Sequence, residues 1–142
     1  MIKGFQDLVV WQKAHKLALE ICKLTNLFPR HEHLTSRLRR AASLILSNLA
    51  ERYRGPSTKE LQSLTVANGL AEELLYFLTF ASDLRYFPPQ DQDRLKRESA
   101  SIVQMIAALA RSVTERVNSC VSGPILVNAG YRTLTSGEGR MT

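Results

Sequence analysis

Residues 57–84 read STKELQSLTVANGLAEELLYFLTFASDL, and this stretch decides the fold class. It opens with a capping box, in which the side chains of Ser57 and Glu60 can satisfy each other's free backbone amides. Apolar residues then recur every three or four positions, which predicts one long helix. Three aromatic residues widen the apolar face until it almost encircles the helix: Tyr76, Phe77 and Phe80. A helix of this kind lies at the centre of a bundle or contacts a second chain.

Three further stretches carry the same period. The first is expected to start at Asp7 as N-cap and to end before Pro29, because the residue before a proline is driven out of the helical region. The second covers residues 32–53, and the last begins with Asp91 as its cap and ends near residue 121. The second helix has the clearest inner face, formed by Leu34, Leu38, Ala41, Ala42, Ile45 and Leu49.

Four amphipathic helices joined by short turns pack most simply as an antiparallel up-down-up-down bundle. We therefore expect an all-α protein in which residues 1–120 form a four-helix bundle. No stretch alternates apolar and polar residues as a half-buried strand does. Residues 121–142 hold four glycines and many small polar residues, and we expect them to form a flexible, loosely ordered C-terminal tail.

Composition excludes several classes of protein. The 142 residues are 44% hydrophobic and 23% charged, which is typical of one globular domain. No apolar run approaches the roughly 20 residues that cross a bilayer, and no apolar signal core follows Lys3. The two cysteines, Cys22 and Cys120, are too few for a disulfide scaffold. We therefore expect a cytoplasmic protein that makes no contact with a membrane.

The sequence shows little sign of catalytic or metal chemistry. His31 and His33 flank Glu32 in a turn, and His15 lies near the apolar edge of the first helix; neither arrangement has the helical spacing of a zinc pair. Glycine-rich phosphate loops and the common hydrolase and metalloprotease motifs are absent from the sequence. The sequence predicts a protein that is not an enzyme and has no metal and no cofactor.

Positive charge is concentrated in the first half of the chain. Eleven of the 19 lysines and arginines lie within residues 1–60, against five of the 13 acidic residues. Arginine forks bind phosphate with two hydrogen bonds, so this half is a candidate for nucleic-acid binding. The candidate contacts are Arg37, Arg40, Arg52, Arg54 and Lys59. The alternative is that these arginines pair within the bundle, for example Arg40 with Glu51.

Several ordered motifs resemble one family. The opening Phe5-Gln6-Asp7-Leu8-Val9-Val10-Trp11-Gln12-Lys13-Ala14 matches the pattern F-x-D-L-x-V-W-Q-x-A. Thr25-x-x-Phe28-Pro29 and the stretch from Leu38-Arg39-Arg40 to Ser47-Asn48-Leu49-Ala50-Glu51 follow in order, and then Ser57-x-Lys59-Glu60, Ala67-x-Gly69 and Glu73-Leu74. Over about residues 5–113 the chain resembles the 23S rRNA intervening-sequence protein family of bacterial four-helix-bundle proteins.

This resemblance implies a ring-shaped homo-oligomer, a pentamer, with a nucleic-acid role and no enzymatic activity. It also implies a polar network of Asn48, Glu51 and Glu73 that would be buried and fix the helix register. The alternative function is a protein-interaction scaffold, or an accessory subunit for a partner such as a reverse transcriptase. That role would use Tyr76, Phe77 and Phe80.

The sequence departs from the family pattern at four places. Arg52 follows Glu51 where the family usually has glycine, and Leu46 stands where it often has proline. Leu70 and Leu75 replace a serine and a glutamate of the third helix. The fold is expected to tolerate these changes, because they add charge at a helix end or apolar surface within a helix.

Overall fold

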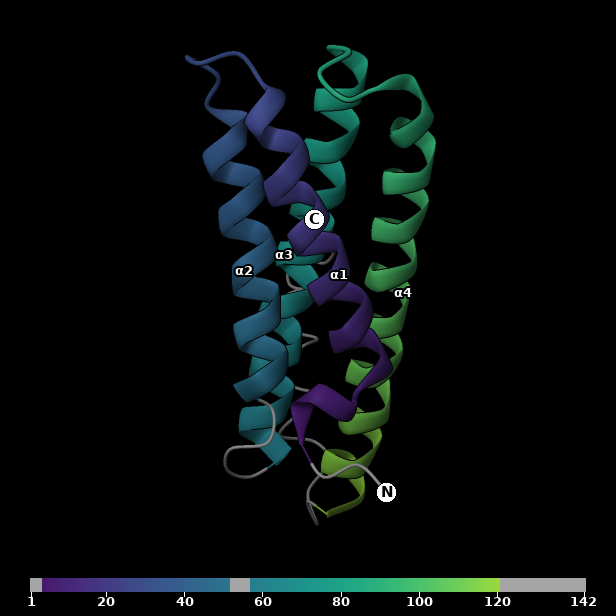
Figure 1. The fold of residues 1–142 in the computed structure, drawn as a ribbon. Helices are drawn as coiled ribbons and strands as arrows, with labels where there is room; N and C mark the ends of the chain where they lie inside the picture. Colours follow the sequence, from purple (N-terminus) through teal and green to yellow (C-terminus); the bar gives the residue numbers. More distant parts are fainter. Residues whose placement is uncertain (1–3, 52–56, 121–142) are drawn as a thin grey trace, which may run out of the picture.

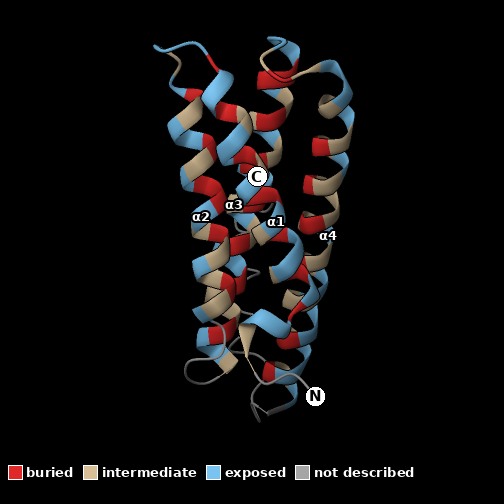
Figure 2. Ribbon diagram, viewed as in Figure 1, coloured by how far each residue is buried: buried red, intermediate tan, exposed pale blue. Residues whose placement is uncertain are grey.

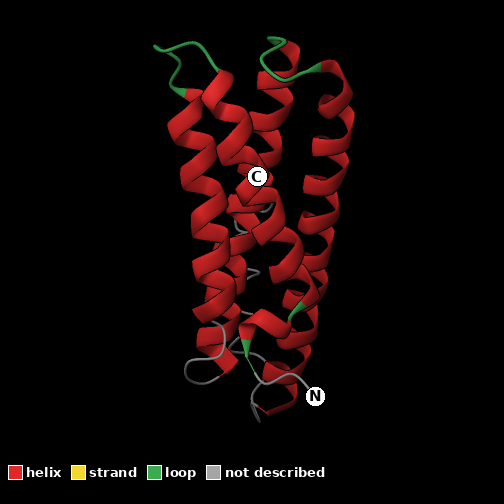
Figure 3. Cartoon of the chain, in the orientation of Figure 1, coloured by secondary structure: helices red, strands yellow, loops and turns green. Residues whose placement is uncertain are grey.

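The computed structural model describes residues 4–51 and 57–120, and nearly all of this part of the chain is helical (Figure 3). The four long helices are α1 (Val9–Leu24), α2 (Leu34–Glu51), α3 (Ser57–Asp83) and α4 (Pro89–Cys120). Short 3-10 turns precede and follow α1, at Phe5–Asp7 and Thr25–Leu27. The described residues include no strand, and none of their helices has the length and hydrophobicity of a membrane-spanning segment.

The helices run antiparallel in chain order, so each lies beside its predecessor and α4 returns to the side of α1 (Figure 1). The most extensive contacts are those of α3 with α4 and of α2 with α3. The predicted up-down-up-down bundle is therefore confirmed. The expected tail, residues 121–142, lies outside the described residues.

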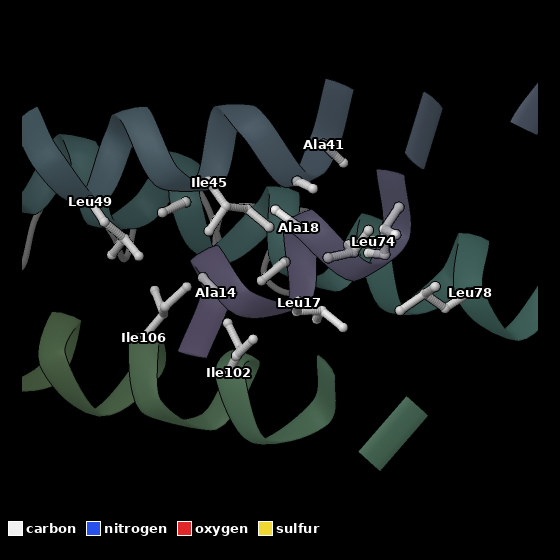
Figure 4. Packing of buried hydrophobic residues seen from close by; sticks show 14 of the residues in the cluster. Ala14, Leu17, Ala18, Ala41, Ile45, Leu49, Leu74, Leu78, Ile102 and Ile106 are labelled. Carbon is white, nitrogen blue, oxygen red and sulfur yellow. The ribbon is translucent and has the colours of Figure 1, made fainter. Parts of the chain in front are cut away.

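The core lies along the bundle axis, where buried positions of all four helices meet (Figure 2). All six residues of the predicted inner face of α2 are buried. Ala14, Leu17 and Ala18 of α1 pack among side chains from the other three helices, including Ile45, Leu74 and Ile102 (Figure 4). The alanines on α1, α2 and α3 let the helices approach closely, while leucine and isoleucine fill the space between them.

The start of α1 differs from the prediction. Asp7 is not the N-cap: it ends the preceding 3-10 turn, and its amide donates to the carbonyl of Gly4 at 3.1 Å. Leu8 occupies the capping position and is buried, and the Phe5 ring packs edge-on against Trp11 with centroids 5.0 Å apart. Apolar packing of the turn therefore sets this helix start, in place of a side-chain cap.

Helix α4 also begins earlier than predicted, at Pro89 instead of after Asp91. Proline suits the first helical position, because its missing N–H would have no partner there. Asp91 lies in the first turn, where its carboxylate accepts a hydrogen bond from Arg94 Nη2 at 2.7 Å. Helix α3 begins at Ser57 itself, the residue predicted to cap it. Glu60 of the predicted capping box is buried and accepts from Arg116 Nη2 of α4 at 3.3 Å.

A hydrogen bond joins the two turns at one end of the bundle. The Tyr86 hydroxyl, in the α3–α4 turn, donates to Glu32 Oε2 at 2.6 Å, and the amide of Leu34 donates to Glu32 Oε1 at 3.0 Å. These two hydrogen bonds, that of Tyr86 first, lower the pKa of Glu32 below its ordinary value of 4.5. The same bond raises the pKa of Tyr86 above its ordinary value of 10.0.

Replacing Tyr86 with phenylalanine is expected to lower stability at neutral pH and to flatten its decline in acid. A lowered carboxyl pKa gives stability that is present above pH 4.5 and is lost as the pH falls through the folded-state pKa. Urea unfolding at pH 7 and pH 3 measures both effects. Tyr76→Phe is the control, because it deletes an exposed hydroxyl that makes no hydrogen bond to the described residues. Equal pH profiles for the two variants and the wild type would contradict the assignment.

Candidate nucleic-acid interface

Helix α2 directs its three central arginines to different environments. Arg39 is engaged within the bundle: its Nε donates to Thr25 Oγ1 at 2.9 Å, and its Nη2 donates to the carbonyl of Cys22 at 3.2 Å and to Asn26 Oδ1 at 2.8 Å. These acceptors lie at the C-terminal end of α1, where carbonyl groups lack helical partners. Arg39 therefore ties α1 to α2.

Arg37 and Arg40 are one turn apart on the outer side of α2, and both are exposed. Neither takes part in an ion pair within residues 4–51 and 57–120, and the expected alternative, Arg40 with Glu51, does not form. The Arg37 guanidinium lies 5.8 Å from the centroid of the Phe77 ring of α3. An aromatic face holds a cation in place without neutralising it, so Arg37 can still bind an anion.

These two arginines line a hollow of about 300 Å³ between α2 and α3. His33, Ser36, Phe77 and Glu73 complete its walls. His33 and Ser36 were not among the predicted site residues, although the spacing 33, 36, 37, 40 places them on the same helical face as the arginines. Glu73 is the one acidic residue among those that line this hollow, and its negative charge would repel a phosphate there.

Lys59 is exposed and lies in a different hollow, of about 420 Å³, near the other end of the same pair of helices. Asn48, Glu51 and Val66 also line it. Along α2 the distance from Arg40 to Glu51 is roughly 16 Å at 1.5 Å per residue. The structure therefore places Lys59 on the α2–α3 side but does not bring it beside Arg37 and Arg40. Arg52 and Arg54 lie outside the described residues.

The expected buried network of Asn48, Glu51 and Glu73 differs from what one chain contains. Glu51 and Glu73 are exposed and line separate hollows, while the half-buried Asn48 donates from Nδ2 to the carbonyl of Leu44 at 2.8 Å. The amide is thus satisfied within its own helix, and the two carboxylates remain hydrated. One chain by itself therefore does not bring Asn48, Glu51 and Glu73 together.

A second basic hollow, missed by the sequence reasoning, lies between α1 and α4. Lys13, Lys16, Arg97 and Glu98 line it, and its volume is about 260 Å³. Beside this hollow, Arg94 contacts three carboxylates: those of Glu20, Asp91 and Glu98. These four groups together carry a net negative charge. That charge offsets part of the positive charge of Lys13, Lys16 and Arg97.

The described residues hold no group of three or more histidine, cysteine, aspartate or glutamate side chains that could bind a metal ion. His31 and His33, the predicted turn pair, are both exposed. The side chains that meet at the hollow between α2 and α3 are cationic, aromatic and hydroxylic, with one carboxylate. That combination suits the binding of an anion.

Comparison with known proteins supports the fold and the family. A protein from the S23 ribosomal protein family of Bacteroides thetaiotaomicron, described as having unknown function, has a similar crystal structure with a TM-score of 0.66. The two share 18% sequence identity, and the alignment covers 72% of this chain and 96% of that one, so the likeness concerns the fold alone. Among curated proteins, none matches this chain.

The family model described as 23S rRNA-intervening sequence protein matches residues 6–108. That match runs from the turn before α1 into α4 and, apart from Phe5, covers the motifs that carried the resemblance. The chain therefore belongs to the 23S rRNA-intervening sequence protein family.

Proposed function

We propose that this chain is a non-enzymatic, cytoplasmic protein that binds nucleic acid through the arginines of α2. The observation that carries the proposal is that Arg37 and Arg40 are exposed, adjacent and free of ion pairs within the described ranges. In the same chain Arg39, Arg94 and Arg116 are all engaged by protein acceptors. Two guanidinium groups left to water on one helix face are well suited to contact successive phosphates.

The protein is further proposed to act as a homo-oligomer, a pentamer, as the family resemblance implies. Repetition of Arg37 and Arg40 around a ring multiplies a modest contact, because each further phosphate is bound at high effective concentration. Arg52 and Arg54, which follow α2 in the sequence, and Lys59 of α3 would add further phosphate contacts. Multi-angle light scattering checks this part, with a mass near five times the 16.0 kDa of one chain expected.

Removing both arginines tests the binding proposal. Fluorescence anisotropy with RNA and DNA oligonucleotides is expected to show binding at low salt that Arg37→Ala/Arg40→Ala weakens at least tenfold. The slope of log affinity against log salt should fall by about 0.7–0.9 for each phosphate that the variant no longer neutralises. Arg97→Ala/Arg111→Ala is the control, because it removes the same charge from two exposed positions of α4.

Two results would contradict the proposal. One is that the wild-type chain binds neither RNA nor DNA at low salt. The other is that the control variant loses binding while the Arg37 and Arg40 variant keeps it. That second result would move the binding surface to the hollow lined by Lys13, Lys16 and Arg97.

A protein-interaction role is the alternative function, and the exposed aromatic residues of α3 favour it. Tyr76 is 62% exposed and Phe80 is 45% exposed, although both are large and mostly apolar. Such residues are common at protein interfaces, where a partner such as a reverse transcriptase or a second copy would cover them. Loss of self-association in Tyr76→Ala/Phe80→Ala, with nucleic-acid affinity unchanged, would favour this role.

A further inference from the structure

The exposed aromatic rings of α3 form an ordered group. The rings of Tyr76 and Phe80 are nearly parallel, with an interplanar angle of 11° and centroids 6.2 Å apart. Phe77 lies beside them, with its centroid 5.4 Å from that of Tyr76. Because 76 and 80 are one helical turn apart, the helix itself holds the two rings in this arrangement. Tyr76 and Phe80 also remain exposed in the single chain.

The aromatic group is continuous with the basic one. Phe77 lines the hollow that holds Arg37 and Arg40, and the Arg37 guanidinium lies over its ring. Through Phe77, the rings of Tyr76 and Phe80 are therefore linked to Arg37 by successive ring contacts. His33 adds a further flat, polar ring at the edge of the hollow.

We infer that this surface binds single-stranded nucleic acid in preference to duplex, an inference that rests on the proposed function. Unpaired bases would stack on Tyr76 and Phe80, while the phosphates that join them would contact Arg37 and Arg40. Single-strand binding proteins combine aromatic side chains with basic side chains. Every base can stack on an aromatic ring, and the basic groups contact the phosphates of the backbone. A duplex keeps its base faces stacked inside and can use only the arginines.

A protein partner is the competing occupant, and Glu73 distinguishes it. This carboxylate lines the hollow together with Arg37 and Arg40 and is exposed. It repels a phosphate, so Glu73→Gln should strengthen the binding of a single strand severalfold. A second copy or another protein that met this mixed-charge surface would instead use Glu73 as an acceptor, and the same change would weaken its association.

The test compares one labelled oligonucleotide, alone and annealed to its complement, as ligands of the full chain. We expect the wild-type protein to bind the single strand more tightly. Tyr76→Ala/Phe80→Ala should lower single-strand affinity about tenfold and leave duplex affinity nearly unchanged, because the bases can no longer stack on the aromatic rings. Leu19→Ala is the control: it truncates an apolar side chain of α1 that is 52% exposed and lies outside the proposed interface, so it should change neither affinity. Circular dichroism confirms that the variants are folded.

The failures are distinguishable. If the wild type binds both forms equally and the aromatic variant changes nothing, the inference is wrong while the proposed function stands. If the wild type binds neither form, the proposed function itself fails. If Tyr76→Ala/Phe80→Ala lowers the mass of the free protein and Glu73→Gln weakens self-association, the rings belong to a protein interface and the inference is overturned.

Discussion

Replacing Leu78 with alanine is expected to lower the free energy of unfolding by about 2–5 kcal/mol, the range for a buried leucine whose cavity cannot collapse. Leu78 is fully buried on α3, the helix with the most extensive contacts in the bundle. Its side chain packs in the core formed by all four helices (Figure 4). Helix α3 packs against both α2 and α4. A shift of α3 toward one of these helices to fill the cavity would therefore weaken its packing against the other.

Chemical denaturation followed by circular dichroism measures this loss of stability. Leu84→Ala is the matched control, because it makes the same truncation at a residue that is 42% exposed just after α3. We expect the control to cost well under 1 kcal/mol, as surface substitutions usually do. Similar losses at the two positions would mean that α3 is not the centre of the core. If the chain is an oligomer, both variants must be compared at one protein concentration.

Replacing Arg94 with alanine is expected to cost about 1–2 kcal/mol, an amount reduced by solvent screening of partly exposed groups. Arg94 of α4 donates to Glu20 of α1 and to Asp91 and Glu98 of its own helix. Its side chain is 34% exposed, and the side chain of Glu20 is 27% exposed. Three carboxylates would then share a site with no cation between them, so part of the destabilisation is mutual repulsion.

A double-mutant cycle separates the two parts of this effect. Glu20→Gln removes one of the three carboxylates, so the pair Glu20→Gln/Arg94→Ala should lose less stability than the two single changes together. Arg97→Ala, three residues along α4 and exposed, is the control and should lie within about 0.5 kcal/mol of the wild type. Strict additivity of the first two changes would show that Glu20 and Arg94 do not stabilise the packing of α1 on α4.

The sequence was sufficient to predict the parts of the fold that depend on apolar periodicity. The inner face of α2 was predicted residue by residue, because a helix that packs on one side shows its burial in the spacing of leucine, isoleucine and alanine. The start of α1 was not predictable in this way. Asp7 has the chemistry of a cap, but packing of Phe5 on Trp11 draws the chain into a 3-10 turn, and that contact between rings carries no period.

The candidate site was predictable in kind but not in detail. Charge showed that the first half of the chain is basic, yet nothing in Arg37-Leu38-Arg39-Arg40 says which guanidinium is used internally. Arg39 donates hydrogen bonds to Thr25 and Asn26 because the packing of α1 on α2 brings these side chains within its reach. The contact of Arg37 with Phe77, and the exposure of Glu73, likewise depend on how α2 packs on α3. Such contacts between distant residues follow from packing and have no local signature.

Ultraviolet crosslinking of the full chain to a single-stranded oligonucleotide, followed by peptide mapping, tests most directly whether nucleic acid binds along α2. We expect crosslinks within residues 33–40, at the start of α2, and within residues 76–80 of α3, and we expect Arg37→Ala/Arg40→Ala to weaken them. Crosslinks confined to α1 and α4, around Lys13, Lys16 and Arg97, would contradict it.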